Sequence, residues 1–215
     1  MKALALSLAF FSVLSLSGMA GYRDDLEPVG KELAQKAGKQ LSDEAAKFEK
    51  PQVKVEADPE KANGVHVPTK VGVLVVPQKG LEPNEELAAK FKTDRGASLA
   101  FLFLYNITPV IDGKPVDGSQ LRSVKLTDDS GTEHTVHVLL LAVRQLADDD
   151  YRLHAYGHED KPLVEARFSE GSPGQVPEPV AVDIKDPNVS THQGKLVITV
   201  FGKYQASFTV GHKAQ

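Results

Sequence analysis

Residues 97–105 have the sequence ASLAFLFLY, which predicts a β-strand that is buried on both faces. Side chains alternate between the two faces of a strand, yet here both sets are apolar. One face would carry Ala97, Leu99, Phe101, Phe103 and Tyr105, and the other Ala100, Leu102 and Leu104. A strand of this kind lies in a sheet that protein covers on both sides.

A second long apolar segment, 135–145, and several shorter ones flank this strand in the sequence. The shorter segments are 52–57, 71–76, 121–126, 151–157, 162–168 and 180–184. Short strands separated by turns are typical of an antiparallel β-sandwich or barrel. The predicted fold class is therefore mainly β, an antiparallel β-sandwich or barrel-like fold with one N-terminal helical segment.

Residues 195–201 and 204–210 form the clearest β-hairpin in the sequence. Gly202 would occupy the first central position of a two-residue type II′ turn, where a positive φ is required. Phe201 would then pair with Tyr204. The side chains expected to share one face are Val197, Thr199, Phe201, Tyr204, Ala206 and Phe208. The opposite face would carry Leu196, Ile198 and Val200, which a second sheet or the N-terminal helix must cover.

Residues 24–50 contain the predicted helical region, because apolar side chains recur there at steps of three and four residues. They are Leu26, Val29, Leu33, Ala37, Leu41, Ala45 and Phe48. Gly38 weakens a helix interior by about 1 kcal/mol relative to alanine, and a break into two helices is the alternative. The stripe is thin and alanine-rich, so we expect the helix to dock on a larger body rather than to bind a partner protein.

The segment 171–179, GSPGQVPEP, has the composition of a linker. About three strands follow it, too few for an independent core. We therefore interpret it as a long Gly/Pro-rich loop inside one domain. The predicted organisation is a signal peptide at 1–20, a helical segment at 21–51 and a single β-sandwich domain at 52–215.

The first twenty residues have the three parts of a secretory signal peptide. Lys2 provides the positive charge and 3–16 is an almost uninterrupted apolar run. Gly18 and Ala20 are the small residues that precede a cleavage site. The run is shorter than the roughly 20 residues that span a bilayer, so we expect cleavage and no membrane span afterwards. The predicted location is secreted or periplasmic, and the lack of cysteine favours bacterial export over eukaryotic secretion.

Charge and cysteine content exclude several functions. Lys and Arg number 25 against 29 Asp and Glu, a net charge of −4, which gives no basic surplus for nucleic acid. Cysteine is absent, which excludes disulfides, thiolate catalysis and cysteine-bound metals. The motifs G-x-S-x-G and H-E-x-x-H are missing as well. The sequence predicts no nucleic-acid partner, no cofactor and no catalytic residue, and it favours a protein that is not an enzyme.

The strand predicted at 151–157 carries a set of polar side chains on one face, opposite apolar ones. The polar set is Arg152, His154, Tyr156 and, in the following turn, His158. Two residues four apart on a strand are separated by about 13 Å, too far for both histidines to bind one metal ion directly. We therefore interpret the set as a solvent-exposed polar face, which is the candidate contact surface if the protein binds a polar or anionic ligand.

Together these features predict an exported, non-catalytic β-sandwich that acts as a binding or structural module, with an unknown protein or a small polar ligand as its partner. The alternative is an exported hydrolase or metal-handling protein with a dispersed His/Asp site, since many sites are built from residues distant in sequence. A deep pocket with convergent His or carboxylate groups would favour that alternative. A filled sandwich with only a shallow surface would favour the binding module.

Overall fold

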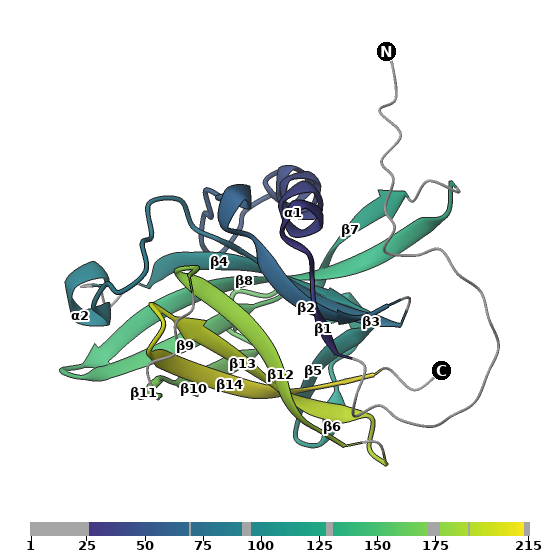
Figure 1. Ribbon diagram of the computed structural model, residues 1–215. Helices are drawn as coiled ribbons and strands as arrows, with labels where there is room; N and C mark the ends of the chain where they lie inside the picture. The colour runs from purple at the N-terminus through teal and green to yellow at the C-terminus, as the bar shows by residue number, and fades with distance from the viewer. Residues whose placement is uncertain are drawn as a thin grey trace.

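Two antiparallel β-sheets pack face to face, and one helix covers the outer side of the larger sheet (Figure 1). The computed structural model describes residues 26–68, 70–91, 96–127, 131–171, 177–188 and 190–212. Sheet 1 contains β1 (Glu27–Pro28), β2 (Asn63–Val67), β3 (Val71–Pro77), β4 (Ala97–Tyr105), β7 (Arg122–Thr127), β8 (Glu133–Ala147), β9 (Asp150–Tyr156) and β10 (Val164–Arg167). Sheet 2 contains β5 (Ile107–Ile111), β6 (Lys114–Pro115), β11 (Ser169–Glu170), β12 (Val180–Asn188), β13 (Gln193–Val200) and β14 (Tyr204–His212).

Two α-helices accompany the sheets, α1 (Lys31–Ala45) and α2 (Leu87–Lys90), with short 3₁₀ turns at Pro59–Lys61 and Gly118–Gln120. The strand order is β1-β2-β3-β4-β8-β9-β10 in sheet 1, where β7 also pairs with β8. In sheet 2 the order is β12-β13-β14-β5-β6, and β11 also pairs with β14. The predicted fold class, a mainly β antiparallel sandwich, is confirmed, and the described strands do not close into a barrel.

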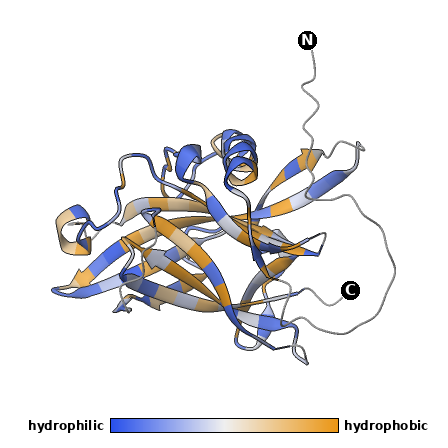
Figure 2. Ribbon diagram, in the orientation of Figure 1, coloured by the Kyte–Doolittle hydropathy of each residue, from blue (hydrophilic) through white to orange (hydrophobic). Residues whose placement is uncertain are grey.

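Sheet 1 is apolar on both faces, as the sequence of β4 predicts. Leu102 and Leu104 pack in the core between the two sheets, whereas Phe101 and Phe103 pack in a second core beneath α1. Figure 2 shows the hydrophobic residues concentrated on the strands, while α1 is mostly hydrophilic on its outward side. The molecule therefore has three layers, with sheet 1 in the middle.

A β-bulge near the start of β4 changes the face of the sheet on which Leu99 lies. The register shifts between Ser98 and Ala100, so that Leu99 joins Ala100 in the core between the sheets. Strict alternation predicts Leu99 on the same face as Phe101, and this prediction is wrong. A bulge places two residues opposite one on the neighbouring strand, which the hydrophobic pattern of β4 alone does not reveal.

Helix α1 docks on sheet 1, as expected, and it is continuous through Gly38. It is shorter than the predicted 24–50. A Cβ atom added to Gly38 would lie 2.8 Å from Ala62 Cβ and 3.1 Å from Val76 Cγ2. The glycine thus allows the helix axis to approach β3 closely, and its cost in helix propensity is balanced by packing.

The final hairpin has a different register from the predicted one. Val200, not Phe201, pairs with Tyr204, and the turn has three residues. Phe201 and Gly202 both have positive φ, of 55° and 75°. Phe201 is held in this unusual conformation because its ring is buried and stacks on Phe91 at a centroid distance of 5.9 Å. Val197 and Thr199 consequently face outward, while Leu196, Ile198 and Val200 share the inner face with Tyr204, Ala206 and Phe208.

The side chain of Asn63 joins the two sheets at one corner of the sandwich. Its amide nitrogen donates to the Val180 carbonyl at 2.7 Å, and the Val182 N–H donates to its side-chain oxygen at 3.3 Å. The side-chain amide of Asn63 therefore links β2 to β12, which do not pair through their backbones. At another corner the chain itself crosses from β10 to β11, with Phe168 buried between them.

Residues 1–20 and most of the loop at 171–179 (172–176) lie outside the described residues. The strands β12, β13 and β14, which follow the loop, contribute Val180, Leu196 and Phe208 to the same core as β4 and β8. The strand expected at 52–57 does not form, since only Ala57 is paired there, in an isolated bridge with Gln78. Neither helix in the described part of the chain has the length and apolar character of a membrane span.

Substituting Gly38 should destabilise the protein even though alanine is the better helix former. Propensity alone would stabilise Gly38→Ala by about 1 kcal/mol, but overpacking against Ala62 and Val76 typically costs about 1–3 kcal/mol. We expect a net loss, measured as the free energy of unfolding in urea. The variant Gly38→Ala/Ala62→Gly removes the closest contact and should show favourable coupling in a double-mutant cycle. A Gly38→Ala protein more stable than wild type would contradict the close approach of helix and sheet.

Candidate functional site

The structure brings three of the four predicted contact residues together on one face of β9. Arg152, His154 and Tyr156 alternate with Tyr151 and other core residues, as expected from the strand period. His158 follows two residues after the strand ends and is exposed. The face is flanked by β8 and β10, so that β9 is not an edge of the sheet.

His154 is buried, and its predicted exposure is wrong. Only 2% of the residue is exposed, whereas the side chain of Arg152 is 30% exposed and Tyr156 is half-buried. Strand alternation predicts the face on which a side chain lies, but not what covers that face. Here Glu165 from β10 lies opposite His154 and approaches its ring from the side.

Both ring nitrogens of His154 lie close to polar atoms of this face. Nδ1 is 3.1 Å from the Tyr156 hydroxyl, and Nε2 is 3.5 Å from Glu165 Oε2. Nε2 is fully buried and lacks a hydrogen bond within the described residues. Burial lowers the pKa of His154, and the nearby Arg144 and Arg152 lower it further, against the opposing effect of Glu165. The neutral imidazole is therefore the favoured form.

The arginine of this face is also paired. Arg152 donates to both carboxylate oxygens of Asp150, at 3.0 and 3.1 Å, and to Glu165 Oε1 at 3.3 Å. The hydrogen bond to Asp150 raises the pKa of Arg152 and lowers that of Asp150. Arg152 and His154 are thus engaged within the protein, and the role of the set as a contact surface stays a prediction.

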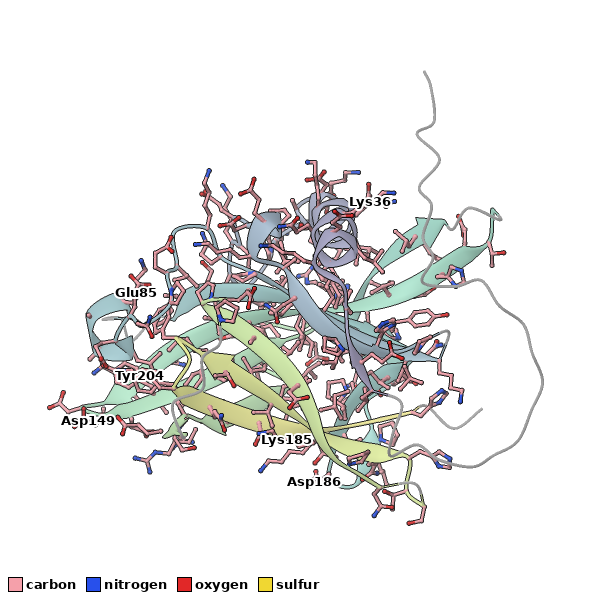
Figure 3. All side chains as sticks on the ribbon, in the orientation of Figure 1. Lys36, Glu85, Asp149, Lys185, Asp186 and Tyr204 are labelled. Atoms are coloured by element: carbon pink, nitrogen blue, oxygen red, sulfur yellow. The ribbon has the colours of Figure 1, made fainter. Side chains whose placement is uncertain are left out.

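A second polar site lies at the end of the sandwich where α2 packs. An open cavity of about 430 Å³ is formed there by residues of α2, β9, β14, the β8–β9 turn and the segment from β10 to β11. Its lining residues are Glu86, Leu87, Ala88, Asp149, Tyr151, Phe168, Glu170 and Tyr204. Figure 3 shows the labelled Asp149 and Tyr204 at this end of the molecule.

One wall of the cavity is an ion pair between α2 and the last hairpin. Lys203 and the Tyr204 hydroxyl both donate to the carboxylate of Glu86. The hydrogen bond from Lys203, and then that from Tyr204, lowers the pKa of Glu86. The Lys203 ammonium also lies 5.0 Å from the centre of the Tyr204 ring.

Three other polar groups that line the cavity have no hydrogen-bond or ion-pair partner within the described residues. Tyr151 is 8% exposed and lines the cavity, yet its hydroxyl forms no hydrogen bond within the described residues. The carboxylates of Asp149 and Glu170 likewise have no salt bridge or hydrogen bond there. Burial raises the pKa of Tyr151, and Asp149 and Asp148 raise it further, so the hydroxyl is protonated at neutral pH. Asp149 and Glu170 are exposed, and all three groups open onto the cavity.

Sequence reasoning did not find this cavity. Its residues come from four separate stretches of the sequence, and Asp149 belongs to what reads as an ordinary acidic turn at 148–150. In the structure Asp149 has a φ of 60° and directly precedes β9. The described residues contain no group of three His, Asp or Glu side chains that could hold a metal ion.

No protein-family model matches the chain, and no curated protein or solved structure matches it either. β-Sandwiches support many unrelated functions, so that the fold alone does not assign one. The chemistry of the site residues must therefore indicate the function.

Acidification should destabilise the protein partly through His154. Its pKa is lowered in the folded state, whereas an unfolded chain has the ordinary value of about 6.5 and binds the proton more readily. The free energy of unfolding should therefore fall as the pH drops below about 6.5 toward the folded pKa. We expect His154→Gln to reduce this slope by up to about 1.4 kcal/mol per pH unit, the value for one proton.

Urea unfolding of wild type and His154→Gln, at several values between about pH 7 and about pH 5, measures this slope. His66 contributes in the same direction, because burial lowers its pKa too, so some slope should persist. His158→Gln is the matched control, since this imidazole is exposed. Equal slopes in wild type and His154→Gln would show that His154 is not a buried neutral group.

Proposed function

We propose that the protein is an exported, non-catalytic binding module that takes a small polar ligand into the end cavity. Export is supported by the signal-peptide features of residues 1–20. The cavity of about 430 Å³ falls within the usual range of roughly 300–1,000 Å³ for ligand sites. Its lining combines apolar side chains with three carboxylates and two tyrosines, which makes it more polar than most such sites.

The observation that carries this proposal is the unpartnered hydroxyl of Tyr151. Its ring is anchored in the core between the sheets, and its side chain lines the cavity. The hydroxyl is not among the fully buried, unpartnered polar atoms of the described residues, so it opens onto the cavity. A bound ligand could hydrogen-bond to this hydroxyl, which a ring fixed in the core presents to the cavity.

The lining residues support binding rather than catalysis. In the described part of the chain they include no histidine, serine, threonine or lysine that could act as a base or nucleophile. Glu86 is held ionised by Lys203 and Tyr204, so it is not poised to donate a proton at neutral pH. The cavity does contain three carboxylates, but no three acidic or histidine side chains of the described residues converge on a possible metal position. No specific observation favours the hydrolase or metal-handling alternative.

A fragment screen by two-dimensional ¹⁵N NMR tests this proposal directly. Fragments of positive, negative and neutral charge are added singly to the purified protein. We expect the amide signals of residues around Tyr151, Phe168 and Tyr204 to shift with the hits. Ala88→Trp should abolish these shifts, because position 88 lines the cavity and a large side chain would fill it.

Ala89→Trp is the matched control, since residue 89 is the exposed neighbour in α2 and does not line the cavity. Both variants should show wild-type thermal unfolding, which separates a blocked site from a damaged fold. The proposal is overturned if no fragment shifts the cavity signals, or if Ala88→Trp and Ala89→Trp affect the hits equally.

A further inference from the structure

We propose that the ligand of the end cavity is an organic cation, with an ammonium group attached to an apolar or aromatic body. This inference rests on the proposed binding function and adds the chemical class of the ligand. It follows from the charges of the cavity, from a contact that the protein makes within it, and from its apolar floor.

The charge of the lining residues is negative. Glu86, Asp149 and Glu170 are carboxylates, and among the residues that the structure describes no lysine, arginine or histidine lines the cavity. Lys203 neutralises Glu86 alone. The two other carboxylates therefore have no cationic partner within the described residues, and an anionic ligand would be repelled.

Acidic side chains alone do not make a site, but Tyr151 adds an independent observation. Its hydroxyl is the polar tip of a side chain that is more than nine-tenths buried, and it has no partner in the described residues. A phenol oxygen accepts hydrogen bonds through its lone pairs. An ammonium group beside Asp149 could donate to both groups, which would satisfy the tyrosine and pair the carboxylate.

The protein itself shows how an ammonium group binds at this end of the sandwich. The amine of Lys203 pairs with the Glu86 carboxylate and lies 5.0 Å from the centre of the Tyr204 ring. Cations within about 6 Å of an aromatic ring centre are attracted by the negative face of the ring. Asp149 and Tyr151 bring another carboxylate and another aromatic side chain to the same cavity.

The apolar side chains that line the cavity indicate that the rest of the ligand is apolar. Leu87 is 2% exposed and Phe168 is 8% exposed, and together with the Tyr151 ring they form an apolar surface. An inorganic cation would gain nothing from contact with these apolar side chains. In the described part of the chain, moreover, no three acidic or histidine side chains are placed to hold a metal ion. An alkyl or aryl ammonium ion matches both the floor and the carboxylates.

Titration calorimetry and ¹⁵N NMR with three matched probes test the inference: 2-phenylethylammonium, the neutral 2-phenylethanol and the anionic 3-phenylpropanoate. We expect the ammonium to bind about four- to twenty-fivefold more tightly than the alcohol, from two exposed ion pairs worth about two- to fivefold each. The anion should not bind. Added salt should weaken the ammonium and leave the alcohol unchanged.

Two charge-removing variants locate the effect. Asp149→Asn and Glu170→Gln should each weaken ammonium binding by about two- to fivefold, the usual size for exposed ion pairs, with no change for the alcohol. Asparagine also tolerates the positive φ of residue 149. Asp183→Asn is the control, because it removes the same charge from an exposed position that does not line the cavity.

The outcomes separate this inference from the proposed function. If the alcohol or the anion shifts the cavity signals at equal or lower concentration than the ammonium, the cation inference fails while the binding function stands. The inference also fails if Asp183→Asn weakens the ammonium as much as Asp149→Asn and Glu170→Gln do. If no probe and no screened fragment shifts the cavity signals, the binding function fails as well.

Discussion

The middle sheet has apolar side chains on both faces, so the folded protein needs another layer over each face to remove them from water. Leu102 and its neighbours require sheet 2, while Phe101 and Phe103 require α1. The parts of sheet 1 that are covered in this way cannot contact a ligand. The positions left for recognition are therefore the ends of the sandwich, the turns, the outward face of sheet 2 and the polar part of sheet 1 around Arg152.

This constraint explains where the cavity lies. At the end of the sandwich the layers stop packing, and turns and the short helix α2 close the core incompletely (Figure 1). Tyr151 bridges the two environments, because its ring belongs to the core and its hydroxyl belongs to the cavity. The Glu86–Lys203 pair links the start of α2 to the turn of the last hairpin, beside the cavity.

The sequence predicts the layers of this fold but not the features that depend on precise register. Hydrophobic periodicity correctly indicates the two-faced β4 and the docked helix, because both are local patterns repeated over many residues. It does not indicate the bulge before Ala100 or the three-residue turn at Phe201, which depend on partners distant in the chain. The burial of His154 and the end cavity were missed for the same reason, since Glu165 and Tyr204 approach through tertiary packing.

Native-state hydrogen exchange measures most directly whether sheet 1 needs both of its covering layers. If it does, the most protected amides of α1, such as those of Ala37 and Leu41, should exchange only through global unfolding. Their opening free energy and urea dependence should then equal those of Leu102 and Phe103 in β4. Exchange of the α1 amides through a separate opening, at clearly lower free energy and with β4 still protected, would contradict this account.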